Sequence, residues 1–398
     1  MNSHLQHLMA EAMRQTGRGE LEAATATLQR ALRGDLGTPA DDAPAGHSRP
    51  VGPAAGAGSV IDVVARRIDE PRAFEGRSGT DRPGADRHAR PGEATAGGAR
   101  REAASSSPAS AERWEDGSFA HGGRTLAYKL FVPARADGEA TAPRALILML
   151  HGCTQDPADF AAGTRMNELA REPGVAVLYP AQTQHANSQR CWNWFKPQHQ
   201  RRGRGEPALL AALAQTVAQR EGIDAARLYV AGLSAGGAMA DILGRAYPDV
   251  FAAVGVHSGL PAGAAHDLMS ALSAMRGPSG PPAGGTRSGV SPPLIVFHGD
   301  ADATVHPDNG RHLVAGALGA QDASDAQVTQ GKSARGRAFV RSVHEATSQH
   351  ADIEHWSLRG GGHAWAGGSQ AGSYTDAAAV DASAEMLRFF MDHPLAPG

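Results

Sequence analysis

The stretch "YVAGLSAGGAMAD", residues 229–241, decides the fold. It passes from an apolar run into small residues, with Ser234 between Gly232 and Gly236. A G-x-S-x-G arrangement with a strand before it and a helix after it is typical of a nucleophile elbow, a strained turn that lifts a serine hydroxyl above a sheet edge. Side chains at the two glycines would collide where strand and helix approach closely. The alternative is a glycine-rich turn whose serine only caps the helix.

The pattern around this stretch predicts an α/β fold. From residue 113 onward, continuous apolar runs alternate with helical stretches, which is typical of a mainly parallel sheet covered by helices on both faces. The predicted strands are residues 125–133, 145–152, 174–180, 227–234, 251–259, 293–302 and 353–358. The predicted helices are residues 157–172, 206–221, 235–247, 306–317 and 378–392, and residues 278–293 are predicted to form a surface loop.

A nucleophilic serine also requires a base and an acid that orients the base, because its hydroxyl is weakly nucleophilic at neutral pH. The α/β-hydrolase order along the chain is serine, then an acid, then histidine, each after a successive strand. "PLIVFHGDADATVHPDN", residues 293–309, offers Asp300 and Asp302. We favour Asp302 as the acid because it stands further past the strand end, and we expect Asp300 to brace the turn.

The base is expected to be His363, which lies on a glycine-rich loop after the strand at 353–358. Most of the 18 histidines lie in polar segments that are typical of solvated side chains. The alternatives to His363, more typical of structural or rim residues, are His298, His306 and His257.

An oxyanion formed on the substrate would need two backbone N–H donors. One is expected from Ala235, at the start of the helix, where amides lack intrahelical partners. The other is expected from Cys153 in "LMLHGCTQDPADF", residues 148–160, where Gly152 frees the backbone. The alternative for this segment is an ordinary strand end.

Composition sets limits on the class of protein. The formal net charge of −3 gives no electrostatic reason to expect nucleic acid or an anionic membrane as the main partner. No apolar run approaches the roughly 18 to 20 residues that span a bilayer. The first residues are interrupted by polar and charged side chains, unlike a secretory signal. These features predict a non-secreted, cytoplasmic protein without a membrane span.

The N-terminal part of the chain differs from the rest. Residues 1–34 place apolar side chains at helical spacing around "TGRGE" and predict a short helical hairpin, a candidate for self-association or contact with a substrate granule. Residues 35–112 are dominated by Ala, Gly, Pro, Ser, Asp and Arg and are expected to be a disordered linker. The apolar "VIDVVARRI", residues 60–68, is either a docking segment or chance. Residues 113–398 are the expected catalytic domain.

Cys153 and Cys191 are the two cysteines of the chain, without the spacing of metal ligands. In a reducing cytoplasm, two free thiols are the first expectation.

Most of residues 113–393 resembles the polyhydroxybutyrate depolymerase family of esterases, which is related to feruloyl and acetylxylan esterases. The resemblance rests on "LMLHGCTQDPADFAAGTRMNELA", "VLYPAQTQHANSQRCWNWF", "HGDADATVHPDN", "GGGHAWAGG" and "GSYTDAAAVDASAEMLRFF", together with the elbow. It implies an α/β-hydrolase fold with Ser234 as nucleophile, Asp302 as acid and His363 as base, and the amides of Cys153 and Ala235 as oxyanion hole.

The resemblance also implies a disulfide between Cys153 and Cys191, and an extracellular location typical of many members. Three tryptophans could line an acyl or alcohol subsite, the alternative for each being core packing: Trp192, Trp194 and Trp365.

The favoured function is a serine carboxylester hydrolase that forms an acyl-enzyme and requires no metal or organic cofactor. Within this class, short-chain hydroxyalkanoate esters compete with feruloyl and acetylxylan-type esters as substrates. Because fold and triad do not choose the scissile bond, a peptidase or acyl transferase is a remote alternative. A hydrolase-like domain that only binds a partner is the non-catalytic alternative.

Overall fold

The computed structural model describes residues 111–134, 145–277, 291–319 and 326–396. The predicted hairpin at 1–34, the segment at 60–68 and nearly all of the predicted linker lie outside the described residues. So does most of the predicted loop at 278–293.

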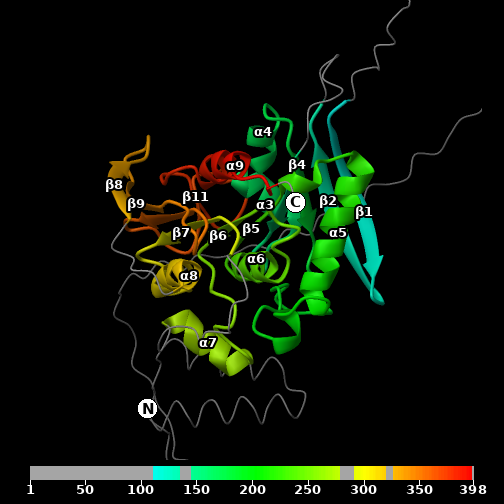
Figure 1. The fold of residues 1–398 in the computed structure, drawn as a ribbon, viewed down its shortest axis with the longest axis horizontal. Helices are drawn as coiled ribbons and strands as arrows, with labels where there is room; N and C mark the ends of the chain where they lie inside the picture. The colour runs from blue at the N-terminus through cyan, green and yellow to red at the C-terminus, as the bar shows by residue number, and fades with distance from the viewer. Residues whose placement is uncertain (1–110, 135–144, 278–290, 320–325, 397–398) are drawn as a thin grey trace, which may run out of the picture. The chain divides into compact units, whose positions relative to one another are not determined.

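A ten-stranded sheet lies at the centre of the described residues (Figure 1), in the order β1-β2-β4-β3-β5-β6-β7-β10-β9-β8. The six central strands, from β4 to β10 in this order, pair in parallel, whereas β1, β2, β9 and β8 add antiparallel edges. The bounds are β1 Arg113–His121, β2 Arg124–Val132, β3 Leu146–Leu150, β4 Ala176–Pro180, β5 Leu228–Leu233, β6 Ala253–His257, β7 Leu294–Gly299, β8 Gln327–Lys332, β9 Ala338–His344 and β10 Ile353–Leu358.

Helices cover both faces of the sheet (Figure 1) and close two hydrophobic cores, one on each face. The first face carries α5 Gly205–Glu221, α6 Ala235–Ala246 and α8 Asp308–Leu318. The second carries α3 Pro157–Thr164, α4 Met166–Ala170 and α9 Ala382–Asp392. The remaining elements are α7 Leu268–Arg276, the 3-10 turns η1 Pro197–His199 and η2 Ala225–Arg227, and the two-residue strands β11 Trp365–Ala366 and β12 Thr375–Asp376. Strands β3 and β5 are buried along their whole length, as expected of central parallel strands.

The sequence pattern predicted the centre of the sheet better than its edges. Each of the seven predicted strands is present, as β2, β3, β4, β5, β6, β7 and β10. Strands β1, β8 and β9 were not predicted because they are partly or largely exposed and lack continuous apolar runs. The predicted helix at 157–172 is wrong as one helix: Arg165 adopts a left-handed conformation, φ 57°, and divides it into α3 and α4.

Among the helices of the described residues, none is both long enough and apolar enough to cross a bilayer.

Candidate active site

Ser234 lies at the turn between β5 and α6 and has the strained backbone of a nucleophile elbow. Its φ of 58° and ψ of −119° are far from the regions that serine ordinarily adopts. Its N–H donates to the carbonyl oxygen of His257 at the end of β6, over 2.9 Å. The side chain makes no capping hydrogen bond to α6, so the alternative in which this serine only caps the helix is wrong.

Glycines allow the close approach that this turn requires. A Cβ on Gly232 would lie 2.4 Å from the backbone of Gly236, and a Cβ on Gly236 would lie 2.0 Å from the carbonyl oxygen of Leu150 in β3. Both distances are impossible for real atoms, and the obstacles are backbone rather than flexible side chains. The elbow is therefore packed directly against the end of β3, where the expected oxyanion loop begins.

Asp302 and His363 are joined by a hydrogen bond between loops that follow β7 and β10. The Nδ1 atom of His363 lies 2.7 Å from Oδ2 of Asp302, and the aspartate side chain is fully buried. An ionised carboxylate can only accept, so Nδ1 is the donor, and in the neutral imidazole the lone pair is then on Nε2. This tautomer is the one that a general base requires. Asp300 instead accepts from the N–H of Gly360 over 2.6 Å, so it braces the turn as expected.

The surroundings of Asp302 favour its ionised form. Burial raises its pKa, but hydrogen bonding to His298 and His363 outweighs burial and lowers the pKa below the ordinary range. Its second oxygen, Oδ1, accepts the N–H groups of Thr304 and Val305 over 2.9 and 2.8 Å. The carboxylate is thus fixed in position and in charge.

The alternative histidines have structural surroundings. His257 is fully buried; its Nε2 accepts the N–H of Ala366 over 2.9 Å, and burial lowers its pKa to about 3. His298 is buried beside Asp302, with Nε2 donating to the carbonyl oxygen of Val305 over 2.9 Å. His306 lies two residues before α8, exposed and close to the carboxylate of Asp308.

The two amides expected to form an oxyanion hole lie on neighbouring segments. Ala235 is the first residue of α6, so its N–H has no partner within the helix. The Cys153 N–H makes no hydrogen bond within the described part of the chain. The two segments are in close contact, since a Cβ on Gly152 would lie 3.6 Å from the carbonyl oxygen of Leu233.

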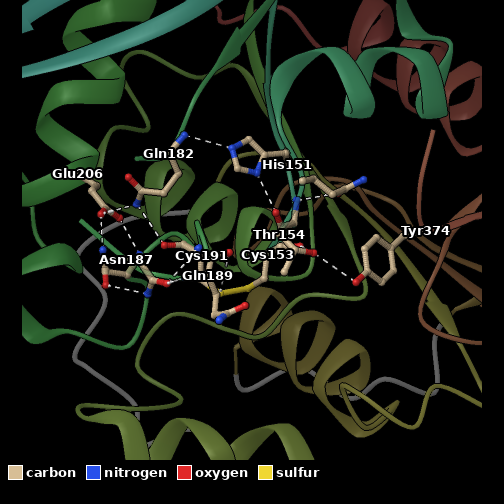
Figure 2. Close-up of a disulfide and its surroundings, with 12 residues drawn as sticks. His151, Cys153, Thr154, Gln182, Asn187, Gln189, Cys191, Glu206 and Tyr374 are labelled. Carbon is tan, nitrogen blue, oxygen red and sulfur yellow. Dashed lines mark hydrogen bonds between the residues drawn. A yellow bond between two sulfur atoms is a disulfide. The ribbon is translucent and has the colours of Figure 1, made fainter. Parts of the chain in front are cut away.

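A disulfide links Cys153 to Cys191, which is 38 residues further along the chain (Figure 2). The first expectation of two free thiols is therefore wrong, whereas the pairing implied by the family resemblance is present. Beside the disulfide, the N–H of Thr154 donates to the carbonyl oxygen of Gln189 over 2.7 Å. The segments around residues 153 and 191, here called the oxyanion loop and the aromatic loop, are thus joined by both a covalent bond and a hydrogen bond.

Glu206 is the centre of a buried hydrogen-bond network behind these loops (Figure 2). Its carboxylate accepts from the Asn193 backbone N–H and side-chain amide, over 2.7 and 2.6 Å, and from the side-chain amide of Gln182 over 2.8 Å. Burial raises the pKa of Glu206, but hydrogen bonding to His199 and Asn193 outweighs it, so the pKa is lowered. A charged carboxylate at the start of α5 thereby fixes the aromatic loop.

The network continues to the oxyanion loop through His151. Its Nε2 accepts the backbone N–H of Gln182 over 3.1 Å, and its Nδ1 donates to the carbonyl oxygen of Gly152 over 2.8 Å. Burial lowers the pKa of His151, which keeps the ring neutral and this tautomer intact. A chain of hydrogen bonds therefore runs from Glu206 through Gln182 and His151 to the backbone next to Cys153.

The three tryptophans are core residues in this structure. Trp365 is fully buried, donates to the Ser383 hydroxyl over 3.0 Å and stacks on His257, so it packs in the core, the alternative to a substrate wall. Trp192 and Trp194 are 1% and 5% exposed and belong to the same hydrophobic core. The indole N–H of Trp192 has no hydrogen-bond partner among the described residues.

The sequence interpretation missed the residues of the polar network, Glu206 and Gln182. The one available signal was an acidic residue in the first turn of a predicted helix, which is common at any helix start. Three of their bonds, Asn193 to Glu206, Gln182 to Glu206 and Gln182 to His151, span 13, 24 and 31 residues, beyond the reach of a motif.

The parallel sheet, the elbow after β5 and the loops after β7 and β10 define an α/β-hydrolase fold. The sequence profile of the family described as Esterase PHB depolymerase matches residues 126–338, more than half of the chain, and the chain belongs to this family.

Individual relatives agree with this assignment. The chain is 32% identical to poly(3-hydroxyalkanoate) depolymerase C of Paucimonas lemoignei over 237 residues, which are 56% of this chain and 55% of that protein. It is 34% identical to feruloyl esterase B of Neurospora crassa over 125 residues, 31% and 41% of the two chains. The chain thus spans about half the length, or less, of these curated relatives.

A solved structure supports the fold. The acetyl xylan esterase from Aspergillus awamori superposes with a TM-score of 0.50 at 20% sequence identity, covering 60% of this chain and 89% of that chain.

Proposed function

We propose that this protein is a serine carboxylester hydrolase that forms an acyl-enzyme, with its catalytic domain in residues 113–398. The proposal is carried by two features together. Ser234 has a strained backbone and a side chain that makes no capping hydrogen bond, and the buried Asp302 accepts a hydrogen bond from Nδ1 of His363. Backbone strain of this kind persists only where surrounding contacts hold the residue in place, and it clusters at functional sites.

In the proposed mechanism, Nε2 of His363 takes the proton of the Ser234 hydroxyl while the serine oxygen attacks the ester carbonyl. The negative charge that develops on the carbonyl oxygen is stabilised by the N–H groups of Cys153 and Ala235. His363 then gives its proton to the leaving alcohol, which departs as the acyl-enzyme forms. A water molecule, deprotonated by His363, attacks the acyl carbonyl, and His363 returns this proton to the Ser234 oxygen as the acid is released. Asp302 keeps its charge throughout and stabilises the imidazolium.

Hydrolysis of p-nitrophenyl butyrate by wild type, Ser234→Ala and Ser342→Ala tests this proposal. Ser342 lies in β9, outside the proposed site, and serves as the matched control. The Ser234→Ala variant is expected to lose on the order of 10⁵- to 10⁶-fold in kcat while its thermal unfolding stays that of wild type. Wild-type turnover in a folded Ser234→Ala variant would refute the assignment.

Short-chain hydroxyalkanoate esters of the polyhydroxybutyrate type are the proposed substrate class. The family description and the names of two relatives, including the poly(3-hydroxybutyrate) depolymerase of Ralstonia pickettii at 35% identity over 150 residues, favour polyesters. Feruloyl or acetylxylan-type esters are the second candidate, favoured by the names of other relatives. A peptidase or acyl transferase remains a remote alternative because the scaffold does not choose the scissile bond.

Release of hydroxybutyrate from amorphous granules, compared with release of ferulate from methyl ferulate, separates the two ester classes. The proposal expects kcat/KM for the hydroxybutyrate ester to exceed that for the ferulate ester. The reverse ranking would select the second candidate. The same granules, sedimented with the full chain and with a chain that begins at residue 111, test the proposed granule contact of residues 1–34.

The protein is further proposed to work in an oxidising compartment or outside the cell. Disulfides persist in such environments and are rare in the reducing cytosol. The Cys153–Cys191 bond supports this location in place of the cytoplasmic expectation. Thiol counting on unreduced, denatured protein purified from its source tests it, since two free thiols would contradict it.

A further inference from the structure

Tyr374 is a large apolar side chain that stays exposed although its backbone is held at the proposed active site. The residue is 47% exposed. Its carbonyl oxygen accepts the N–H of Trp365, two residues after His363, over 2.7 Å where β11 pairs with β12. The backbone of Tyr374 is therefore hydrogen-bonded to the loop that carries the proposed base, while its side chain remains exposed.

The same residue reaches the oxyanion loop (Figure 2). Its hydroxyl lies 3.3 Å from Oγ1 of Thr154. Because Thr154 Oγ1 donates its own proton to the carbonyl oxygen of Cys153 over 2.6 Å, the phenol hydroxyl of Tyr374 is the donor of this contact. Tyr374 thus bridges the His363 side and the Cys153 side of the proposed site.

The backbone of Tyr374 is strained. Its φ is 52°, a left-handed conformation that is a genuine outlier for a bulky side chain and is energetically costly. The preceding residue is firmly held: the N–H of Ser373 donates to Asp159 over 2.7 Å, and its carbonyl oxygen accepts from Gln155 over 3.2 Å. An asparagine or glycine would adopt the same backbone at lower cost.

Strained residues are concentrated around this site. Of the six described non-glycine residues with positive φ, four lie at the elbow, the oxyanion loop, the aromatic loop or Tyr374, namely Ser234, Thr154, Arg190 and Tyr374. A strained and exposed aromatic residue at such a place contributes little to the core. Its exposed position is instead suited to contact with a bound molecule.

We propose that the ring of Tyr374 binds the alcohol portion of the ester, and that it sets a preference for bulky, apolar or ring-bearing alcohols. This inference rests on the proposed function. His363 must protonate the leaving alcohol oxygen, so the alcohol portion lies on the His363 side, where the backbone of Tyr374 is attached. An aromatic face there offers apolar contact, and the hydroxyl bond to Thr154 orients it. In a polyester, the alcohol portion is the next hydroxyacyl unit of the chain.

The test holds the acyl group constant and varies the alcohol. The ratio of kcat/KM for benzyl butyrate to that for ethyl butyrate is measured in wild type, Tyr374→Ala, Tyr374→Phe and Tyr374→Asn. Tyr374→Ala and Tyr374→Asn are expected to lower the ratio by about three- to ten-fold, the effect of one aromatic contact, mainly through KM for the benzyl ester. Tyr374→Phe keeps the ring and is expected to keep most of the ratio.

Thermal unfolding distinguishes this role from a structural one. Tyr374→Asn relieves the backbone strain, so its Tm is expected to equal or exceed that of wild type while its selectivity falls. Trp114→Ala, which removes an exposed aromatic from the edge strand β1, is the matched control and is expected to keep the wild-type ratio.

Two failures have different meanings. A wild type that hydrolyses neither butyrate ester would refute the proposed function. A wild type that hydrolyses both, with an unchanged ratio in Tyr374→Ala, would overturn the inference about Tyr374 alone. A loss in Tyr374→Phe equal to that in Tyr374→Ala would also overturn it, because the hydroxyl rather than the ring would then carry the preference.

Discussion

The elbow and the oxyanion loop lie side by side but are held in place by different forces. Around Ser234, the position of the backbone follows from steric exclusion: Gly232 and Gly236 leave no room for any side chain. Around Cys153, the position of the backbone follows from specific bonds, namely the disulfide and the chain of hydrogen bonds that begins at Glu206. The proposed nucleophile is thus positioned by steric packing, whereas the proposed oxyanion donor is positioned by a disulfide and hydrogen bonds, so the two should respond differently to substitution.

The largest expected effect is at the elbow. Gly236→Ala would put a methyl group 2.0 Å from the carbonyl oxygen of Leu150 in β3, and the obstacle is backbone. We expect a loss of more than about 4 kcal/mol in the free energy of unfolding, or no soluble protein. Gly316→Ala in α8, where an added Cβ meets only the tip of Arg245 at 3.4 Å, is the control. Urea unfolding measures both, and a Gly236→Ala variant of wild-type stability would contradict the steric account.

The disulfide should have the next largest effect. The double variant Cys153→Ser, Cys191→Ser removes a cross-link over 38 residues, which in the chain-entropy account costs about 3–4 kcal/mol. Because the elbow does not depend on the cross-link, Ser234 should still react with a fluorophosphonate while kcat falls. Urea unfolding and labelling rates measure the two effects. If labelling and turnover were lost in equal proportion in a folded protein, the distinction between the two regions would fail.

Glu206 should have a smaller effect on the same loop. Glu206→Gln puts an NH₂ group against the amide donors of Asn193 or Gln182 and leaves one buried donor unsatisfied, at a cost of about 1–3 kcal/mol. A reduction of kcat that exceeds the change in KM is expected, because the loop carries the proposed oxyanion donor, which would act on the transition state. Glu168→Gln, an exposed partner of Arg165, is the matched control. Equal changes in kcat and KM in the two variants would show that Glu206 does not position the oxyanion loop.

The smallest expected effect is a pH dependence of stability. Burial lowers the pKa of His257 to about 3, from about 6.5 in an unfolded chain. Between these values the unfolded state binds a proton that the folded state does not, so acidification destabilises the fold by at most about 1.4 kcal/mol per pH unit from this residue. Protonation of Nε2 would break its bond to the Ala366 N–H. The free energy of unfolding, measured with urea between pH 7 and pH 5, should fall less steeply with decreasing pH in His257→Gln than in wild type. An unchanged pH dependence would contradict this assignment.

The elbow and the order of the proposed triad were predictable from the sequence because their signals are local. Each residue lies at or shortly after the end of a central parallel strand, and such strands have apolar runs that can be recognised individually. The choice of Asp302 over Asp300 followed from its distance past the strand end, and the structure pairs Asp302 with His363 and Asp300 with the turn at Gly360.

The surroundings of the oxyanion loop could not be predicted in the same way. The contact between Thr154 and Tyr374 spans 220 residues. The neighbours that place Trp365 in the core, Ser383 and His257, also lie outside its sequence motif, so the motif could not reveal its burial. Residue type alone does not distinguish an indole that packs in the core from one that meets a substrate.

We propose that His363 makes Ser234 nucleophilic. Intact-protein mass spectrometry after treatment with a fluorophosphonate tests it most directly, with peptide mapping to place the adduct. The account predicts one adduct at Ser234 in wild type, none in Ser234→Ala, and a labelling rate in His363→Ala lower by several orders of magnitude. An unlabelled wild type, an adduct at another residue, or an unchanged rate in His363→Ala would contradict it.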